Sequence, residues 1–526
     1  QYLIKLLAAK PDRDQLEGFL REYGSPFFRR LAEDHRMEPE GEACGKAVRD
    51  AAYDASRDPE RLRQATARLS SPNPAIREIA IDQLRGADAA AAPVLLEALA
   101  DSQRSEEHAS IRSGIVAIGA ALLPPMLGAT ETPDASLRAQ VHRVLGEYRT
   151  PRAVPLLVGP AADPLAAEEL RESARDALLQ IVGRVPSQRE AVQYLVGQVR
   201  EYYNGALPGQ LDYEDQLTLW RWDPEQQTVT PHRYPAIQAS RAMAARLAQD
   251  LLAFAPEDPS VQRLLLAALL DFAKTDAGLD QPLPRGEGSA FALAAAACTE
   301  AIEQVLEFTM QKDYGIAATA AAEVLGAIGD VSLVAANGGR PRPLVRALRH
   351  PNRRVRLAAA EAVMQLDPQQ PYAGSSYLPE ALGYFARTVG SRRVLVAHPR
   401  IERAQTLIGM LSQLGYEADS ASTGNTAFRM ATRNPDYEFV LISDSLPDPS
   451  ATETLAMFRR DPRTADLAVG LMAREANMQQ ATDTADLDPL CLAFPRPHDT
   501  QLIAFQTGRL VELSERRSVD SDERLD

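Results

Sequence analysis

The sequence predicts an α-solenoid of helical repeats followed by an α/β domain with a five-stranded parallel sheet. One observation is a phrase of an apolar residue followed by Arg, which recurs at the start of predicted helices between residues 76 and 356. A second is the change of hydrophobic period at Arg392, where buried strands begin to alternate with helices of roughly 10–15 residues. The third is the stretch 437–451, in which the apolar run 439–442 leads into a short polar loop, as a buried parallel strand does.

Length and charge limit the class of protein. A chain of 526 residues is too long for one hydrophobic core and indicates about two to four domains. The composition, with 45% apolar and 6% aromatic residues, is that of a folded globular protein. A net charge of −15 argues against sequence-independent binding to nucleic acid or anionic lipid, because both need a basic surface. The basic stripe 349–356 is one place where an acidic partner is able to bind.

Cysteine content and hydropathy narrow the choice further. Cys44, Cys298 and Cys491 are too few and too scattered for a disulfide framework or a zinc site, and Cys491 is expected to pack in the core. The longest apolar runs are far shorter than the ~20 residues of a membrane-spanning helix, so we expect no membrane span.

The recurring phrase predicts two blocks of helical repeats, residues 58–185 and 289–366. An apolar stripe at helical spacing follows each copy, and a shorter helix entered at a proline precedes several of them. The steps between copies are irregular. The copies are Ile76-Arg77, Ile111-Arg112, Leu137-Arg138, Leu170-Arg171 and Val355-Arg356.

Two copies are nearly complete, in SPNPAIREIAIDQL and HPNRRVRLAAAEAVMQL. They resemble the HEAT-repeat family, in which Asp or Asn, three residues later Val or Ile, then Arg, and three residues after it Ala open the second helix of each pair. The resemblance implies stacked helix pairs that share one core and offer an extended concave surface. An irregular helical bundle is the alternative.

Two segments are similar to tetratricopeptide units. Residues 1–57 are predicted to be helical, with a break at Pro11 and Asp12 and a helix end at Gly24. A pair of amphipathic helices that caps the repeats is the alternative for this segment. Residues 237–288 are predicted to hold a second such helix pair, followed by a Pro/Gly-rich loop of a length that is often functional or mobile.

Residues 186–236 are predicted to be an insertion with a β-hairpin. Segments 217–222 and 228–232 are expected to pair as two strands across a turn that contains Pro224. Trp220 and Trp222 stand two residues apart and therefore on one face of a strand. We interpret them as packing the hairpin onto the helices. The alternative is an anchor for a partner, because Trp is enriched at binding hot spots.

Residues 367–390 are predicted to link the helices to an α/β domain over residues 391–514, and residues 515–526 to form a disordered charged tail. The phrases LGYEADSASTGNTAF and DPRTADLAVGLMA, with Leu446-Pro447, resemble the receiver family of two-component signalling proteins. The resemblance implies a flavodoxin-like sheet of order 2-1-3-4-5. In such sheets the site lies at the carboxyl ends of the strands.

The residues that carry receiver chemistry are replaced. The acidic pair that holds Mg²⁺ in the family falls on His398 and Pro399, which supply no carboxylate. The phosphoacceptor Asp falls on Ser443, and the switch Thr or Ser falls on Met472. The family's Lys falls on Arg496, which keeps the positive charge alone. We therefore expect a pseudo-receiver that retains the fold and has lost phosphotransfer.

Two alternatives concern this edge of the sheet. Asp444 acts as the phosphoacceptor if the alignment shifts by one residue. Alternatively, His398, Asp444 and His498 stand at one edge and form a transition-metal site. We regard the histidines as ordinary polar residues of the rim.

These features favour a non-enzymatic scaffold or adaptor that binds protein partners of unknown identity, without a cofactor and without nucleic acid. A regulator whose receiver-like domain still switches through an unusual ligand or phosphorylation is the alternative. An enzyme is the third, because some HEAT-like proteins resemble bilin lyases or alkylpurine DNA glycosylases. The receiver resemblance favours the cytoplasm. Since the chain starts at Gln1, an exported protein that has lost an N-terminal segment is the alternative location.

Overall fold

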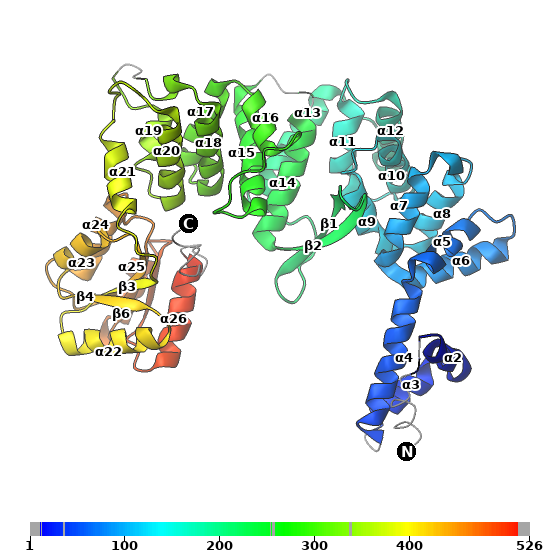
Figure 1. Ribbon diagram of the computed structural model, residues 1–526, viewed down its shortest axis with the longest axis horizontal. Coiled ribbons are helices and arrows are strands. Elements are labelled where there is room, and N and C mark those ends of the chain that lie inside the picture. Colours follow the sequence, from blue (N-terminus) through cyan, green and yellow to red (C-terminus); the bar gives the residue numbers. More distant parts are fainter. Residues whose placement is uncertain are drawn as a thin grey trace. The chain divides into compact units, whose positions relative to one another are not determined.

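The chain divides into two compact units, Gln1–Leu265 and Leu266–Asp526, and each is described by itself (Figure 1). The computed structural model describes residue 11 and residues 13–34, 37–252, 254, 258–335 and 339–513. The predicted helical turns before Pro11 and the predicted tail 515–526 lie outside the described residues.

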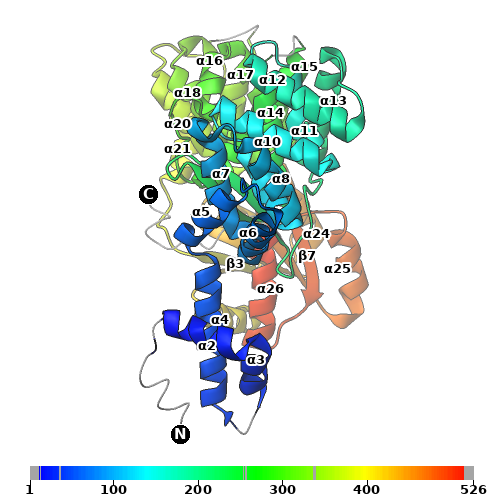
Figure 2. The ribbon, with the colours of Figure 1, turned by 90° about the vertical axis from the view of Figure 1, so that its right-hand side faces the viewer.

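The first unit begins with three helices that have a small core of their own. Helices α2 (Arg13–Tyr23) and α3 (Ser25–Glu33) pack beside α4 (Glu40–Ser56), as Figure 2 shows. Phe28, Cys44 and Val48 form this core. Helix α2 ends before Gly24, as predicted, because Gly24 has a φ of 76°, which side chains with a Cβ rarely adopt.

Nine helices follow in the described part of this unit before the hairpin, and each packs against helices nearby in sequence. Helix α6 packs on α8, α8 on α10, and α10 on α12, while α5 packs on α7 and α11 on α13. Packing between alternate helices builds two layers that share a core. The helices are α5 (Pro59–Arg68), α6 (Pro74–Ala87), α7 (Ala92–Ala100), α8 (His108–Ile118), α9 (Leu123–Ala129), α10 (Ala135–Tyr148), α11 (Val154–Ala162), α12 (Glu168–Val182) and α13 (Gln188–Tyr203).

The recurring arginine has a local role at three of its positions. Arg77, Arg171 and Arg356 each donate to backbone carbonyls of the turn before their own helix. At two of these helices, those of Arg77 and Arg356, the N-terminus is also capped by an asparagine, Asn73 or Asn352, whose side chain accepts backbone N–H groups. The phrase therefore ties a turn to the helix that follows it, which explains why Arg recurs at this point. Its assignment to HEAT repeats stays a prediction.

Among the described residues, each unit contains a close helix–helix contact at a glycine, which we call a glycine joint. In α10, a Cβ added to Gly146 would lie 2.9 Å from Ala177 Cα and 2.9 Å from Gln180 Oε1 of α12. In α18 (Gly315–Ile328), a Cβ on Gly326 would lie 2.7 Å from the Cα of Ala362 and 2.8 Å from Gln365 Oε1, both of α20 (Arg353–Leu366). Both glycines follow Val-Leu, and both face an Ala and a Gln three residues apart. The joint is thus a second structural repeat besides the arginine.

The predicted hairpin is present. Strands β1 (Gln216–Asp223) and β2 (Thr228–Pro235) pair antiparallel, and Asp223 Oδ1 accepts the backbone N–H groups of Glu225 and Gln226 in the turn. The hairpin packs on α9 and on α14 (Ala236–Leu252), which follows it.

Helix α15 (Pro259–Ala277) contains the boundary between the units, and the second unit continues with helices that again pack on alternate neighbours. Helix α18 packs on α16 and α20, and α17 packs on α19. The Pro/Gly-rich loop after α15 is held by the buried Lys274, which donates to Gln281 O at 2.5 Å and pairs with Glu323. The remaining helices are α16 (Ala290–Ala296), α17 (Thr299–Gln311), α19 (Pro343–Ala347) and α21 (Tyr377–Phe385).

The second unit ends in an α/β domain with a five-stranded parallel sheet of order β4-β3-β5-β6-β7. In chain order β3 is the first strand of this sheet, and it lies between the second strand, β4, and the third, β5. Val394 and Val396 contribute to the core under α22 and α26, whereas Leu395 and Ala397 contribute to the core under α23, α24 and α25. The strands are β3 (Arg393–Ala397), β4 (Glu417–Ala421), β5 (Tyr437–Ser443), β6 (Ala468–Ala473) and β7 (Cys491–Pro495), and the helices are α22 (Ile401–Gln413), α23 (Gly424–Ala431), α24 (Ala451–Arg460), α25 (Met478–Ala485) and α26 (Thr500–Leu513).

Among the described residues, no single helix is long and apolar enough to cross a membrane. Helices His108–Ile118 and Ala120–Ala129 satisfy the length and composition criteria only as a pair, and they are bent by 106° at the break between them.

The glycine joints predict that replacing glycine by alanine lowers the stability of the fold at a joint and raises it at a glycine with open space around it. Gly146→Ala and Gly326→Ala are each expected to lower the free energy of unfolding by about 1–3 kcal/mol, because the new methyl meets backbone atoms that cannot yield without shifting a helix. Gly197→Ala in α13 is the control, since a Cβ there has no atom within 4 Å. It should stabilise by roughly 0.5–1 kcal/mol through helix propensity. Urea unfolding followed by circular dichroism measures all three, and equal effects at the three positions would contradict the joint.

Candidate functional site

Three of the predicted receiver positions meet at the carboxyl edge of the sheet. Ser443 is the last residue of β5 and lies opposite Met472 of β6 in the parallel register. Arg496 follows β7, and its backbone N–H donates to Ala473 O at 3.1 Å. The side chain of Met472 is 1% exposed and belongs to the core on one face of the sheet. A methionine has no hydroxyl, so this position offers none at the ends of the strands.

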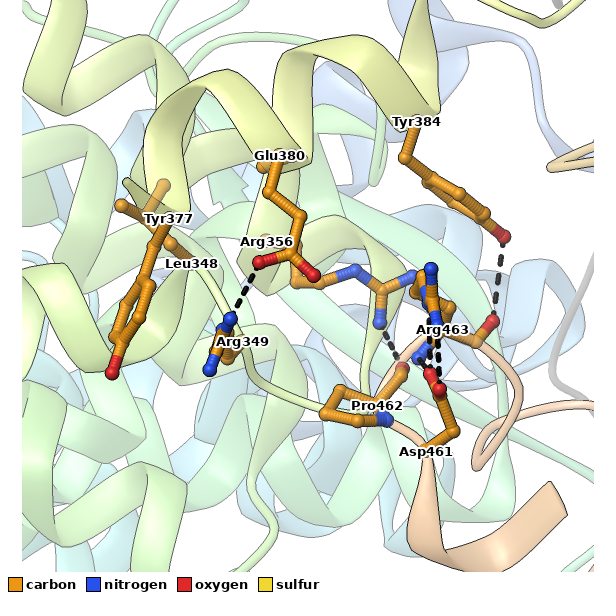
Figure 3. Close-up of a pocket in the computed structure, with 10 residues that line it drawn as sticks. Leu348, Arg349, Arg356, Tyr377, Glu380, Tyr384, Asp461, Pro462 and Arg463 are labelled. Carbon is orange, nitrogen blue, oxygen red and sulfur yellow. Dashed lines mark hydrogen bonds and ion pairs between the residues drawn. The ribbon is translucent and has the colours of Figure 1, made fainter. Parts of the chain in front are cut away.

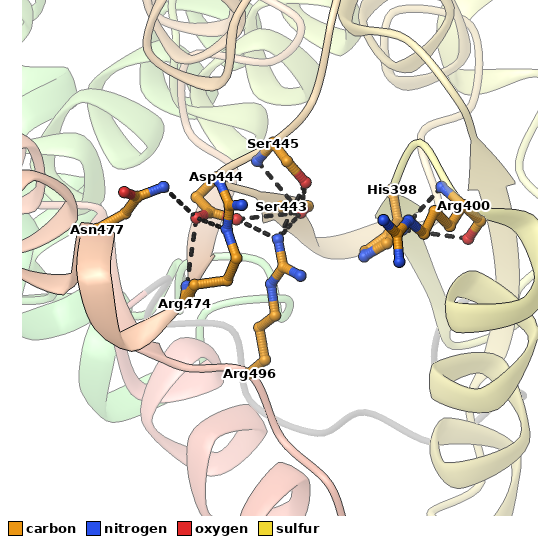
Figure 4. Close-up of polar contacts among 8 residues, drawn as sticks. All are labelled: His398, Arg400, Ser443, Asp444, Ser445, Arg474, Asn477 and Arg496. Atoms are coloured by element: carbon orange, nitrogen blue, oxygen red, sulfur yellow. Dashed lines mark hydrogen bonds and ion pairs between the residues drawn. The ribbon is translucent and has the colours of Figure 1, made fainter.

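The carboxylate of Asp444 is the centre of the site (Figure 4). Its Oδ2 accepts from Arg474 Nε at 3.0 Å, from Arg474 N at 3.3 Å and from Asn477 Nδ2 at 2.7 Å. Its Oδ1 pairs with Arg496. Both oxygens are therefore engaged, and the side chain is only 7% exposed. One carboxylate connects the end of β5 to the loop after β6 and to the loop after β7.

Arg496 also binds two hydroxyls. Its Nη2 donates to Ser443 Oγ and to Ser445 Oγ, each at 3.0 Å. The residue at the phosphoacceptor position is thus held by the residue at the Lys position, without an anion between them. The loop after β5 is fixed as well, because Gly424 N and Asn425 N of α23 donate to Pro447 O and Asp448 O at 2.9 Å.

Electrostatics favour the ionised form of Asp444. Burial by itself would raise the pKa of this carboxyl, but hydrogen bonds from Arg474, Asn477 and Arg496 outweigh it and lower the pKa to about 2. The group is charged at neutral pH, and the two guanidinium groups are its counterions.

The structure does not bring the proposed metal ligands together. His398 is 4% exposed, and its Nδ1 accepts the backbone N–H of Arg400 at 3.0 Å. Burial and the nearby charge of Arg496 lower its pKa, so the imidazole is neutral at pH 7. His498 is mostly exposed and pairs with Asp499. In the part of the chain that the structure describes, no group of three or more His, Cys, Asp and Glu is arranged to hold a metal ion. The hypothesis of a metal site at His398, Asp444 and His498 is therefore not supported. Pro399 adds no ligand atom beside His398.

At the opposite, amino ends of the strands, the loops of the sheet pack on helices α20 and α21 around a cavity of about 220 Å³ (Figure 3). Arg356 donates to Pro462 O, and Tyr384 Oη donates to Arg463 O at 3.3 Å. Arg353 Nη1 donates to Pro435 O at 2.7 Å. These carbonyls belong to the loops that precede β5 and β6, so the contact is made at the amino ends of the strands.

The link between the helices and the sheet is tied to the same edge. Asp436 accepts the backbone N–H of Val389 at 2.9 Å and the hydroxyl of Thr388. Arginines of the basic stripe 349–356 also have partners within the second unit. Arg349 pairs with Glu380, and Arg354 pairs with Asp280. The interpretation of this stripe as a site for an acidic partner stays a prediction.

The two tryptophans lie where the hairpin meets the helices, and both are partly buried. A Cβ on Gly128 of α9 would lie 2.4 Å from Trp220 O, so the strand backbone touches the helix. Arg221 Nε and Trp222 N donate to Glu131 Oε2 at 3.2 and 3.3 Å. These contacts support the interpretation that the segment packs the hairpin onto the helices.

Comparison with known proteins gives partial likenesses. No protein-family model and no curated protein matches the chain. A sensor protein from Polaromonas sp. JS666 is 24% identical over 23% of this chain and 97% of its own, with a TM-score of 0.22. A response regulator receiver domain protein from Clostridium thermocellum is 18% identical over 23% of this chain and 96% of its own, with a TM-score of 0.22. A structure of microtubule polymerases with tumor overexpressed gene (TOG) domain arrays is 14% identical over 89% of this chain and 98% of its own, with a TM-score of 0.17.

Sequence reasoning missed Arg474 and Asn477. Arg474 follows β6 directly and Asn477 stands three residues later, at the carboxyl ends of the strands, where parallel sheets carry their sites. Polar residues immediately after a predicted strand are the signal that would have found them. From the sequence, Asp444 is expected only as an alternative phosphoacceptor or as a metal ligand.

The depressed pKa of Asp444 predicts acid sensitivity of the α/β domain. The ionised group stabilises the fold fully above its unfolded pKa, near pH 4, and this contribution is lost as the pH falls to about 2. The loss is roughly 2 kcal/mol. Urea unfolding between pH 5 and pH 2 should show this loss in the wild type and a shallower dependence in Asp444→Asn. Parallel pH profiles of the two proteins would contradict the assignment.

The docked edge predicts a second measurable effect. Arg353→Ala removes the donor to Pro435 O and is expected to increase hydrogen exchange at Val389 and trypsin cleavage after Arg387, while both domains stay folded. Arg346→Ala is the matched control, because Arg346 pairs with Glu307 on exposed helix surface. An unchanged exchange rate at Val389 in Arg353→Ala would show that this contact does not hold the link.

Proposed function

We propose that the protein is a non-enzymatic protein–protein interaction scaffold, in which the receiver-like domain is a docking module with one fixed state. The observation that carries this proposal is the set of contacts that Asp444 makes with Arg474, Asn477 and Arg496, which we call the Asp444 clamp. A receiver switches when a phosphoryl group rearranges the loops at the carboxyl edge. Here Arg474, Asn477 and Arg496 already hold those loops through one carboxylate.

The neighbouring positions support the same proposal. His398 and Pro399 replace the carboxylates that would hold Mg²⁺, and Ser443 cannot form an acyl phosphate. Asp444 stands one residue beyond the strand, with both oxygens occupied by donors. A phosphoryl group would have to displace two guanidinium contacts without a metal to neutralise its charge.

The helical region supports the scaffold part of the proposal. The repeated turn arginines and the two glycine joints support the HEAT-like repeat architecture that the sequence predicts. Repeat arrays commonly bind protein partners along an extended surface. The proposal places two binding surfaces in one chain, one on the helices and one on the receiver-like domain.

The test measures hydrogen exchange of the intact protein with and without Mg²⁺ and beryllofluoride, a phosphoryl mimic. We expect no change in loop 474–477, because the clamp is already closed. Asp444→Asn should exchange faster in this loop, and it shows that the measurement detects an open clamp. Slower exchange in the wild type on adding the mimic would contradict the proposal and favour a regulator that still switches.

The scaffold part is tested with the full-length chain as bait in a native lysate. Proteins should be captured in the same amounts with and without the phosphoryl mimic, because binding does not depend on a switch. Capture of no protein, or release of a small-molecule chromophore from the bait, would contradict the scaffold.

A further inference from the structure

A groove of about 580 Å³ lies between α4, α5 and α6 in the first unit. Small and aliphatic side chains line it, including Ala55, Leu62 and Ala65, which are 5%, 3% and 1% exposed. Leu20 of α2 closes one side. Its floor is therefore apolar and preformed, as in grooves that receive side chains of a partner.

One face of α6 extends the groove. Gln83 and Gly86 line it, and Ile76 and Ile79 lie on the same helix face because the four positions are spaced three and four residues apart. Ile76 is 39% exposed and Ile79 is 55% exposed. Two exposed isoleucines beside an apolar groove indicate a face that another molecule covers.

The rim of the groove is basic. Arg61 and Arg68 line it from one face of α5, seven residues apart, which corresponds to about 10 Å along a helix. Arg61 already takes part in an interaction within the chain, whereas no described residue makes a hydrogen bond or an ion pair with the guanidinium group of Arg68. The acidic residue of the lining, Asp82, is paired with Arg85. The chain as a whole is strongly acidic, so this local positive charge selects an acidic partner.

Gly86 gives the partner room. A Cβ added at this position meets no atom within 4 Å, so the floor beside α6 is open. A groove between helices with an apolar floor and charged rim matches the way amphipathic helices bind, with apolar anchors inside and charges outside.

We propose that this groove binds an amphipathic α-helix of a partner protein, with small or aliphatic side chains on the floor. Two carboxylates seven residues apart on that helix face Arg61 and Arg68. The inference deepens the proposed scaffold function, since it names the chemistry of a partner for the helical region.

The probe is a fluorescein-labelled helical peptide with an Ala/Leu face and two Glu residues seven positions apart, measured by fluorescence anisotropy against the full-length protein. A second peptide carries Lys in place of the two Glu residues. We expect the Glu peptide to bind at least roughly tenfold more tightly than the Lys peptide, because like charges at a rim oppose binding.

Three variants locate the binding. Gly86→Leu fills the groove from a helix position with open space around it, and should weaken the Glu peptide at least roughly tenfold without unfolding the protein. The double variant R61E/R68E should reverse the preference, so that the Lys peptide binds better. Arg63→Glu is the control, because Arg63 lies on α5 outside the lining and pairs with Glu97 at 3.2 Å on exposed surface.

The outcomes separate this proposal from the proposed function. Equal binding of the Glu peptide to wild type, Gly86→Leu and R61E/R68E would overturn it, as would absence of binding to the wild type. A wild-type dimer in sedimentation that Gly86→Leu abolishes would also overturn it, since the occupant would then be a second copy of the chain. In each of these cases the response of loop 474–477 to the phosphoryl mimic still tests the fixed docking module independently.

Discussion

A single buried carboxylate joins three strand ends of the α/β domain. Burying the charge of Asp444 costs free energy unless donors surround it, and Arg474, Asn477 and Arg496 supply those donors from two different loops. The ends of β5, β6 and β7 are consequently connected through one group. These contacts are the basis of our proposal that the domain is a docking module with one fixed state.

The two edges of this sheet are stabilised in different ways. The carboxyl edge is closed by its own side chains. The amino edge is held by α20 and α21, whose Arg353, Arg356 and Tyr384 donate to backbone carbonyls of the sheet loops. Carbonyl acceptors place few demands on the sequence of those loops, so this contact depends mainly on the backbone path.

Periodicity predicted much of the fold, since the apolar run 439–442 is part of β5 and the hairpin around Pro224 is present. These two features depend on local pattern. The receiver resemblance, rather than periodicity, placed Ser443 and Met472 at the ends of neighbouring strands, where they lie opposite one another in the register. The clamp was not predicted, because it depends on how Arg474 and Asn477 turn back from their loop. The exposure of His498 likewise depends on the path after β7. The recurring pair of an apolar residue and Arg is visible in the sequence. The additional hydrogen bond from Arg356 to Pro462 O of the α/β domain is not, because it depends on how the two parts pack.

The glycine joints have a consequence for how the helical region is studied. Gly146 and Gly326 make the same approach to an Ala and a Gln, in different units and among different neighbours. The protein therefore contains two copies of one contact, each in a separate context. A difference between them measures what the surroundings add, and agreement gives the intrinsic strength of the joint.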